Sequence, residues 1–395
     1  MLEQLTPLPE DPILGLTQAF AADDNPHKVD LGVGVYKDEQ GNTPIMSAVQ
    51  QAQSLWHQRE QSKSYLPAIG IAGFNASVAD LLLGDKHIAL QDQRVTCIQT
   101  PGGCGANRLA AELVKRCKPG AKIWLPTPSW VNHFPLLQGA GLTIAEYPYY
   151  DKANHAIDFA AMMETLEKAE PGDLILLHGC CHNPSGADLS QQQWRDIATT
   201  CKGRQLIPFI DIAYQGLGNG LDEDAWGVRH LAAELDELLI VYSCSKNFGL
   251  YRERVGLALV ISPSQKLAKI CVDQLINIAR GMYTMSPSHG AAIVDIILHD
   301  PVLVRLWCDE LAEMRDRVKQ LRQTFYQQTK AAGMGDRFQF ITGENGLFSA
   351  LGLTPEQVDV LKSKYSIYMV NSSRINIAGL NQENMDYVIN ALTIL

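Results

Sequence analysis

Residues 238–261 read LLIVYSCSKNFGLYRERVGLALVI, two apolar runs on either side of a polar segment. Both runs are apolar at consecutive positions, which is typical of strands in a sheet that is covered on both faces. Similar short runs precede them and alternate with helical patterns such as 107–117 and 191–201. They lie at 95–99, 121–125, 142–146, 173–178 and 206–211. Alternating strands and helices predict an α/β fold with a mostly parallel sheet of seven strands.

The pattern changes after this sheet. A long charged helical stretch covers 301–331, and apparent strands follow near 338–341, 346–351 and 373–377, which predicts a second, smaller α+β domain. At the other end, residues 1–12 are rich in proline and acidic residues, and we expect an extended N-terminal arm there. The chain therefore has one large α/β domain and a smaller region built from a different pattern.

Composition excludes several classes of protein. The chain has 33 Lys and Arg against 43 Asp and Glu, a net charge of −10, and no basic run, which disfavours nucleic acid and anionic membranes as partners. No apolar run approaches the roughly 20 residues that span a bilayer. The nine cysteines are scattered without a CxxC pair, so we expect reduced thiols and a cytoplasmic location. An anionic ligand of such an acidic chain must be bound by a few well-placed arginines.

Polar residues that follow the strands are candidates for chemistry, because ligands of open α/β sheets bind beyond the carboxyl ends of the strands. The glycine-rich turn at 100–107 leads into a helix, where backbone amides can bind an anion. It matches neither the dinucleotide-binding motif GxGxxG nor the P-loop motif GxxxxGK[ST], and a turn without a ligand is the alternative. Asn183 can donate to a ligand oxygen or simply form a turn with Pro184. Asp211, followed by Tyr214, can pair with a cation or cap a helix.

Lys246 follows a buried run and two serines, Ser243 and Ser245. Desolvation would lower the pKa of its amine and make it a nucleophile for Schiff-base chemistry; a solvated loop lysine is the alternative. Arg254 opens the next strand. Together with Asp211, these residues give one sheet edge a lysine, an acid, an arginine and hydroxyl donors, which is the set that a pyridoxal phosphate site requires.

With these motifs the sequence resembles the class I aminotransferases of fold type I, in the aspartate/aromatic aminotransferase subgroup, over essentially its whole length. The matching segments are 11–15, 31–37, 64–66, 128–133, 178–186, 211–216, 243–251 and 373–379. The resemblance implies the fold of a fold type I pyridoxal-phosphate-dependent transferase and a homodimer with shared active sites. It assigns 45–310 to a large cofactor-binding domain, and 13–44 with 311–395 to a small domain.

The resemblance also implies a role for each candidate residue. Lys246 is expected to bind pyridoxal 5′-phosphate covalently and to move the substrate proton, Asp211 to pair with the pyridine nitrogen, and Tyr214 to hydrogen-bond the phenolic oxygen. The other cofactor-binding residues are Gly103, Cys104, Trp130, Asn183, Ser243, Ser245, Arg254 and, from the other subunit, Tyr65. The substrate-binding residues are Gly34, Trp130, Asn183, Arg374 and, from the other subunit, Arg280. His133 is expected to support Asp211, and no metal ion is expected at this site.

The implied reaction moves the amino group of L-aspartate to 2-oxoglutarate, giving oxaloacetate and L-glutamate by a ping-pong mechanism. The residues typical of the aspartate branch are Val35, Lys37 and Thr43. Three residues depart from the pattern. Cys104 replaces a hydroxyl donor by a weaker thiol, and Met285 with Ser286 alters the segment beside the side-chain pocket. Met285, Cys104 and Ser64 are not the residues typical of the aspartate branch and make the pocket more apolar, so tyrosine or phenylalanine as substrate is the alternative. A lyase or decarboxylase reaction on the same cofactor also stays open.

Overall fold

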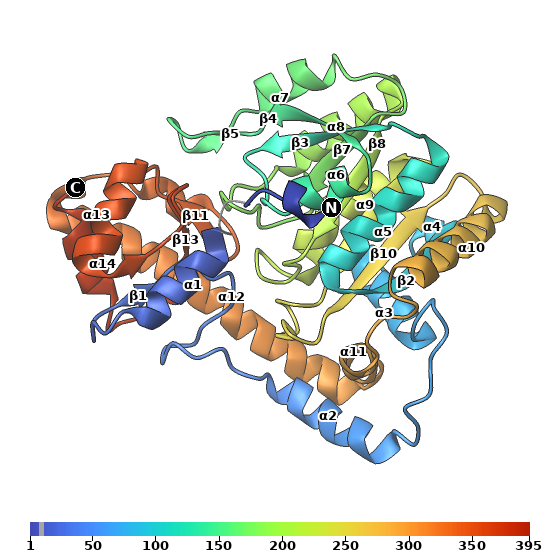
Figure 1. The fold of residues 1–395 in the computed structure, drawn as a ribbon, viewed down its shortest axis with the longest axis horizontal. Coiled ribbons are helices and arrows are strands. Elements are labelled where there is room, and N and C mark those ends of the chain that lie inside the picture. Colours follow the sequence, from blue (N-terminus) through green and yellow to red (C-terminus); the bar gives the residue numbers. More distant parts are fainter. Residues whose placement is uncertain (8–11) are drawn as a thin grey trace. The chain divides into compact units, whose positions relative to one another are not determined.

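The computed structural model describes residues 1–7 and 12–395 and divides by its internal contacts into two compact units (Figure 1). The larger unit comprises Thr43–Arg317 with Glu344–Gly346. The smaller unit comprises Met1–Asn42, Val318–Gly343 and Leu347–Leu395. Each unit is described by itself, and the domain boundaries expected from the sequence stay a prediction.

The larger unit is built on a seven-stranded sheet. Its strands, in spatial order, are β2 (Val95–Pro101), β10 (Val255–Ile261), β9 (Leu238–Ser243), β8 (Ile207–Ile212), β7 (Leu174–His178), β3 (Lys122–Thr127) and β4 (Thr143–Pro148). All neighbouring strands are parallel except β10, which is antiparallel to both β2 and β9. The predicted mostly parallel sheet is confirmed, and each predicted run matches a strand to within two residues.

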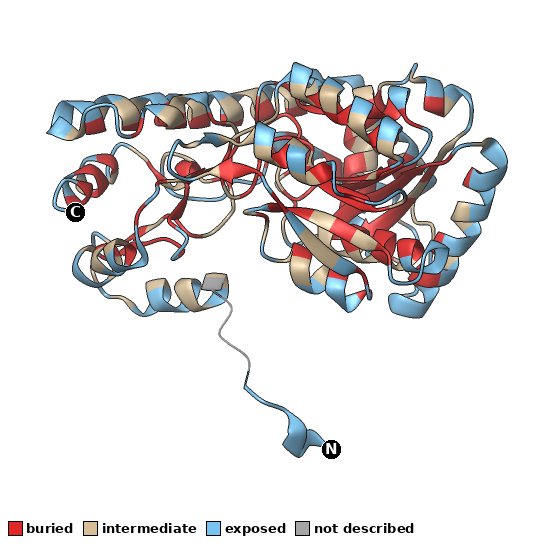
Figure 2. Ribbon diagram, turned by 90° about the horizontal axis from the view of Figure 1, so that it is seen from above, coloured by how far each residue is buried: buried red, intermediate tan, exposed pale blue. Residues whose placement is uncertain are grey.

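Helices enclose this sheet, which explains why its strands are apolar at successive positions. Every residue of β9 and β10 is buried, and Figure 2 shows buried strands with helices around them. Residues of α5 (Gly102–Cys117), α6 (His133–Gly139) and α10 (Gln265–Met282) form one apolar core with the strands. The other elements of this unit are α2 (Ser47–Arg59), α3 (Ala72–Leu83), α4 (Ile88–Gln91), β5 (Tyr150–Asp151), β6 (Ala156–Ile157), α7 (Phe159–Leu166), α8 (Gln191–Arg204), α9 (Leu221–Glu234) and α11 (His289–His299).

The smaller unit joins segments from both ends of the chain. Strand β1 (Val29–Asp30) pairs in parallel with β12 (Ile367–Tyr368), and β11 (Phe348–Ala350) pairs antiparallel with β13 (Arg374–Asn376). Its helices are α1 (Pro12–Ala22), the C-terminal part of α12 (Pro301–Thr329), α13 (Pro355–Tyr365) and α14 (Met385–Leu392). This is the α+β composition that the sequence predicts for the region after the sheet.

Two local predictions need correction. The strand expected near 338–341 is wrong, because Gln339–Gly343 forms a 3₁₀ helix. Phe338, just before this helix, and Ile341, within it, are both buried and lie three positions apart, which is one turn of such a helix. The N-terminal arm is not extended throughout, because Leu2–Gln4 forms a 3₁₀ turn and α1 begins at Pro12. Residues 8–11 of the expected arm lie outside the described residues, and they include Asp11 of the matching segment 11–15.

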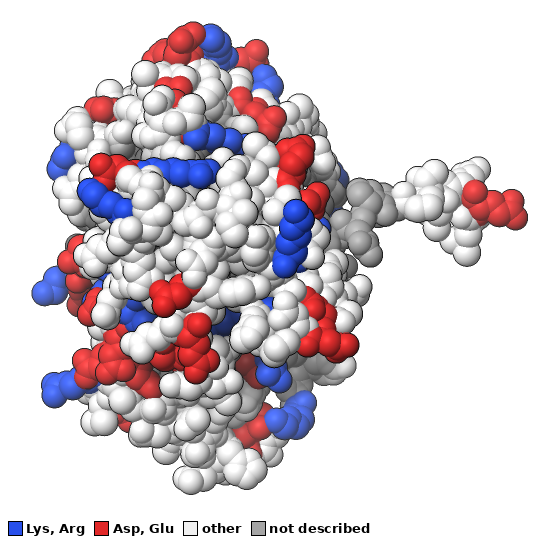
Figure 3. Space-filling model, turned by 90° about the vertical axis from the view of Figure 1, so that its left-hand side faces the viewer, with Lys and Arg blue, Asp and Glu red and all other residues white. Residues whose placement is uncertain are grey.

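All nine cysteines are present as thiols rather than disulfides. Among the described helices, none is both long and apolar enough to cross a membrane. Figure 3 shows Lys and Arg side chains interspersed with Asp and Glu over the face drawn, rather than gathered in one basic patch. The charged surface in this view is therefore mixed.

Candidate active site

Lys246 lies in the loop that follows β9, and its side chain is half-buried. Its Nζ lies over the ring of Tyr214, 4.9 Å from the ring centroid. Burial lowers the pKa of Lys246, an effect that the nearby carboxylate of Asp211 opposes. An amine with a lowered pKa is more often neutral, and a neutral amine is the nucleophile that Schiff-base chemistry needs.

Asp211, near the end of β8, is held by two side chains from elsewhere in the larger unit. Its Oδ2 lies 2.9 Å from Nε2 of His133 and accepts a hydrogen bond of 3.0 Å from Nδ2 of Asn107. Burial alone would raise the pKa of Asp211, but the hydrogen bonds and charge of its neighbours, His133 foremost, hold the pKa below its ordinary value. The site therefore contains a carboxylate that is ionised at neutral pH and able to pair with a cation such as a protonated ring nitrogen.

A chain of buried polar groups extends from Asp211 toward the loop of Asn183. His133 Nδ1 lies 2.9 Å from Ser129 Oγ, which lies 3.3 Å from His178 Nε2. The backbone N–H of Asn183 donates to Nδ1 of the same histidine at 3.4 Å. Burial, assisted by the charge of His133, lowers the pKa of His178 to about 3, so this imidazole is neutral. The chain links the orientation of the Asp211 carboxylate to that of the Asn183 loop.

The N-terminus of α5 forms an anion-binding corner. The helix begins at Gly102, directly after β2, and has no side-chain cap, so its first N–H groups remain available to a ligand. A Cβ atom on Gly102 would lie 2.6 Å from Nη2 of Arg254, and one on Gly103 would lie 3.1 Å from Cβ of Ser243. Glycine at these positions therefore allows the guanidinium and the serine to approach the helix end.

Cys104 lies in the first turn of α5, beside Arg254 and within electrostatic reach of Lys246. Burial raises the pKa of its thiol, although the charge of Arg254 opposes this. Ser245 lies close by, since its backbone N–H donates to Oγ of Ser243 at 3.3 Å. The expected phosphate-binding residues thus gather at one corner of the larger unit.

These groups fit pyridoxal phosphate on three independent counts. The half-buried amine of Lys246 can react with its aldehyde, the ionised Asp211 can hold the proton of its ring nitrogen, and the α5 corner with Arg254 can bind its phosphate. Trp130, in the loop after β3, places its indole edge-on to the His133 ring at 5.2 Å and so lies beside Asp211. The fit comes from side-chain chemistry that the chain itself assembles.

Two expected site residues lie on the surface of the described chain. The side chain of Tyr65 is 86% exposed, and Arg280, in the last turn of α10, is exposed as well. Neither side chain makes a hydrogen bond or ion pair with another residue in the described ranges. Their segments meet where the backbone N–H of Leu66 donates to Sδ of Met285 at 3.2 Å. The neighbouring Ser286 is buried, and its hydroxyl donates to the carbonyl of Gln99 at 3.0 Å.

In the smaller unit, Arg374 and Gly34 come together around one aromatic ring. Nη2 of Arg374 donates to the carbonyl of Gly32 at 2.6 Å, and the guanidinium lies 4.3 Å from the centroid of the Phe348 ring. A Cβ atom on Gly34 would lie 2.8 Å from Cζ of the same ring. Asn376 holds this loop by donating to the carbonyls of Val33 and Val35, both at 2.7 Å. The geometry supports an arginine that binds a small anion beside a tightly packed loop.

Sequence reasoning missed several residues of these assemblies: Asn107, Ser129, His178 and Phe348. Asn107 carries a usable signal, since it lies one helical turn after Gly103 and so shares its face. His178 ends β7 at the ligand-binding edge of the sheet. Ser129 and Phe348 carry none, because an isolated serine or phenylalanine is common in any core.

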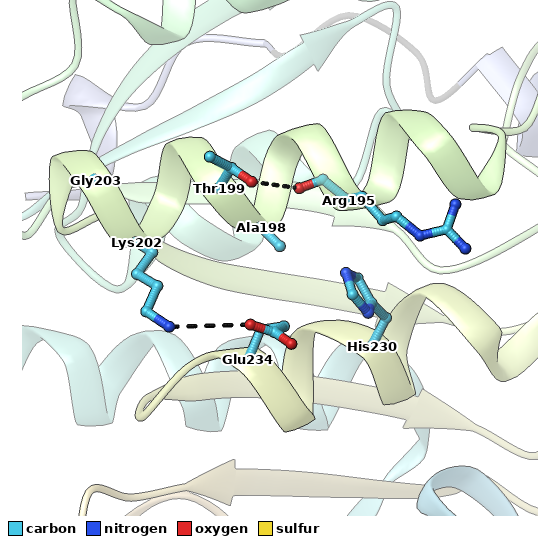
Figure 4. A pocket seen from close by; sticks show the side chains of 7 residues that line it. All are labelled: Arg195, Ala198, Thr199, Lys202, Gly203, His230 and Glu234. Atoms are coloured by element: carbon cyan, nitrogen blue, oxygen red, sulfur yellow. Dashed lines mark hydrogen bonds and ion pairs between the residues drawn. The ribbon is translucent and has the colours of Figure 1, made fainter.

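A groove between α8 and α9 is a separate surface feature. It has a volume of about 470 Å³, and its lining residues include Arg195, Lys202, His230 and Glu234 (Figure 4). Lys202 and Glu234 face each other across it at 3.9 Å. None of the residues expected in the active site lines this groove among the described residues. Its one carboxylate, Glu234, is already paired with Lys202, and the groove holds none of the residues of the Lys246 assembly.

Comparison with known proteins gives a consistent result. The family model "Aminotransferase class I and II" matches residues 26–392. The chain is 45% identical to an aspartate aminotransferase of Haemophilus influenzae, covering 98% of each protein. It is 44% identical to an aromatic-amino-acid aminotransferase of Pseudomonas aeruginosa, covering 98% of the chain and 96% of that protein. A crystal structure of an aromatic-amino-acid aminotransferase from Burkholderia pseudomallei, covalently bound to pyridoxal phosphate, superposes with a TM-score of 0.98 at 42% identity, covering 100% of this chain and 99% of that one.

Proposed function

The chain belongs to the class I and II aminotransferases, and we propose that it transfers the amino group of L-aspartate to 2-oxoglutarate. The products are oxaloacetate and L-glutamate. The observation that carries the proposal is that the larger unit contains an amine of lowered pKa, Lys246, and an ionised acid, Asp211, together with an anion-binding helix end. Pyridoxal phosphate is the cofactor. The aspartate preference is supported by an additional exposed arginine, Arg280, that no described residue pairs with.

The proposed site residues of the larger unit each have a task in this reaction. When bound, pyridoxal phosphate supplies the carbon that receives the amino group and a ring that withdraws electrons from the reacting carbon. Lys246 Nζ would accept the proton from the substrate Cα and deliver it to the cofactor carbon that receives the amino group. Asp211 keeps a proton on the ring nitrogen because its own carboxylate is held ionised. Tyr214 and Asn183 donate to the phenolic oxygen.

Binding of the remaining groups follows from the positive charges. Arg254 would hold the phosphate together with Gly103 and Cys104 at the start of α5 and with Ser243 and Ser245 at and after the end of β9, and Trp130 would stack on the cofactor ring. Arg374 holds the substrate α-carboxylate beside Gly34, in a bidentate contact that orients as well as attracts it. These assignments rest on the contacts within each unit and on the chemistry of the groups.

A homodimer with shared active sites completes the proposal. Arg280 would bind the side-chain carboxylate of a substrate held by the partner subunit, and Tyr65 would donate to the phosphate there. Their exposure and their lack of partners in the described chain support this role, because a cation without a local counter-charge is available to an external anion. The reduced thiols support a reducing compartment, and the cytoplasm is the proposed location.

Aromatic amino acids are the second candidate substrates. Met285 lies beside the Tyr65–Leu66 segment, where its thioether adds apolar surface. Relatives at nearly equal identity are named for either substrate class. One or two such contacts change specificity by only about 1–3 kcal/mol, so a mixed activity is compatible with the same scaffold.

The test compares kcat/KM for aspartate, glutamate, tyrosine and phenylalanine with 2-oxoglutarate as the common acceptor. Aspartate is expected to give the highest value. A higher value for phenylalanine or tyrosine than for aspartate would replace the proposal by the aromatic alternative. Quantifying glutamate in each reaction confirms that the amino group has been transferred rather than released.

A further inference from the structure

Three buried side chains with metal-binding atoms meet between the end of β7 and the start of α9. Sγ of Cys180, Sγ of Cys181 and a carboxylate oxygen of Asp224 all lie within 4.8 Å of one another. The exposed fractions of the three residues are 6%, 2% and 5%. The cysteines follow β7, whereas Asp224 belongs to the first turn of α9. Two segments far apart in the sequence thus place two thiols and a carboxylate together.

The Asp224 carboxylate is rigidly oriented but has capacity for another partner. Its Oδ2 accepts hydrogen bonds from the N–H groups of Gly216 and Gly218 at 2.8 and 2.9 Å, and its Oδ1 accepts one from Asn219 at 2.7 Å. A carboxylate offers about four lone-pair positions, two on each oxygen. These three hydrogen bonds therefore use three of the four positions and leave one, on Oδ1.

A small cavity reaches two members of the cluster, Cys180 and Asp224. It has a volume of about 70 Å³ and is lined by Cys180 and Asp224 together with Asp188 and Glu223. A water molecule takes about 30 Å³ in the liquid, so the cavity has room for an ion with one or two waters. Its lining includes three carboxylates and, within the described residues, no Lys or Arg. This imbalance favours a cation over an anion or a neutral ligand.

The backbone orients the two cysteines. The N–H of Cys181 donates to Oδ2 of Asp188 at 2.9 Å, and the N–H of His182 donates to Oδ1 of the same carboxylate at 3.0 Å. Cys181 has a φ of +51°, in the left-handed region that is uncommon for residues other than glycine. The turn therefore does not relax into an ordinary extended loop but is held where both thiols stay near Asp224.

We propose that Cys180, Cys181 and Asp224 form a binding site for one thiophilic divalent cation of the zinc type. Two thiolates with one carboxylate select such an ion over magnesium or calcium, which prefer all-oxygen ligands. Each thiol releases its proton to solvent as its sulfur–metal bond forms. Ligands 2.3 Å from a tetrahedral zinc lie about 3.8 Å apart, so the present separations need to close by at most about 1 Å. Water in the cavity completes the coordination.

The test titrates zinc into the holoenzyme against a chromophoric chelator, with all proteins carrying Cys117→Ser to remove the exposed thiol. One zinc per chain is expected to bind. Removing a residue that only hydrogen-bonds to a metal ligand weakens metal binding roughly 10–100-fold. Cys180→Ala/Cys181→Ala removes two ligands and should therefore weaken zinc binding by at least about 100-fold. Cys201→Ala, which removes a buried thiol from α8, is the matched control and should bind zinc unchanged.

Two results would overturn the proposal: a parent protein that binds no zinc, or a double cysteine variant that retains the parent affinity. Thermal unfolding in the absence of zinc shows whether the variants keep the parent stability. If the double variant does not fold, Cys180→Ser, which nearly conserves the side-chain volume, decides alone: weakened zinc binding supports the site, and unchanged binding rejects it.

Discussion

Replacing Arg280 by glutamine is expected to separate acidic from aromatic substrates. Arg280 is exposed at the end of α10 and has no ion pair with another described residue, so the substitution removes no contact that stabilises its own subunit. Truncating one side of a desolvated, hydrogen-bonded charge pair costs about 2–5 kcal/mol. Because 1.4 kcal/mol is tenfold, kcat/KM for aspartate should fall roughly 30- to 4,000-fold. Phenylalanine has no side-chain carboxylate, and its kcat/KM should be unchanged.

The assay must isolate one half of the reaction. The acceptor 2-oxoglutarate is itself a dicarboxylate, so steady-state rates would fall with any donor amino acid. Single-turnover absorbance changes of the holoenzyme with aspartate or with phenylalanine avoid this problem. Lys269→Gln is the matched control, because Lys269 is an exposed cation on the same helix. Equal losses for the two substrates, or no loss with aspartate, would refute the role assigned to Arg280.

Mixed dimers show which subunit Arg280 serves. Combining Arg280→Gln chains with Lys246→Ala chains produces dimers in which one site holds an intact Lys246 and, if Arg280 reaches across, an intact Arg280 from the partner. Aspartate activity should then reappear on mixing two nearly inactive proteins. If each Arg280 serves its own subunit, no site in the mixed dimer has both residues, and the activity stays low.

Three further outcomes are expected. Asn107→Ala removes one neutral and one charge-assisted hydrogen bond, so it should lower the free energy of unfolding by roughly 2–4.5 kcal/mol and weaken cofactor binding. The control Asn75→Ala removes one neutral hydrogen bond and should lower the free energy of unfolding by about 0.5–1.5 kcal/mol without changing cofactor affinity. Equal cofactor affinities of the two variants would contradict the role of Asn107. Burial holds the pKa of His182 well below 6.5 and lowers that of His178 to about 3, so below pH 6.5 the unfolded chain binds protons that the folded chain does not. The free energy of unfolding should therefore fall with decreasing pH by up to about 1.4 kcal/mol per unit for each histidine, and denaturant unfolding of the His178→Asn/His182→Asn variant should show a flatter slope than the parent. Cys104→Ser replaces a thiol by a stronger donor and should tighten cofactor binding roughly 2- to 12-fold in a titration of the apoprotein, whereas weaker binding would place the thiol outside the phosphate corner.

The strands of the sheet could be predicted because their signal is local. Runs such as 238–243 and 255–261 are apolar at every position, since both faces of the sheet are covered, and the structure places β9 and β10 on the same residues. The segment 338–341 shows where this reasoning fails. Its alternating apolar residues suggest a strand, but Phe338 packs against Phe325 of α12 with ring centroids 5.5 Å apart, and the buried spacing of three residues selects a 3₁₀ helix.

The candidate site was predictable to the extent that its residues follow strands or match a motif. Lys246, Asp211 and Arg254 each lie at a strand end, where the fold itself directs attention. Asn107 and Ser129 lie within predicted segments, the turn at 100–107 and the matching segment 128–133, but their role appears only in their contacts with Asp211 and His133. The sequence around a residue does not show which distant side chain it supports by a hydrogen bond.

The strands of the sheet, their order along the chain and the types of residue that could carry the chemistry follow from the sequence, because they depend on neighbours along the chain. The charge states and the side-chain pairings follow from the folded chain. Asn107 and Asp211 are 104 positions apart, yet their hydrogen bond helps to hold that carboxylate ionised. Cys180 and Asp224 likewise meet only through the folding of α9 near the end of β7. Burial and electrostatic fields arise from groups that are close in space, and sequence spacing does not reveal them.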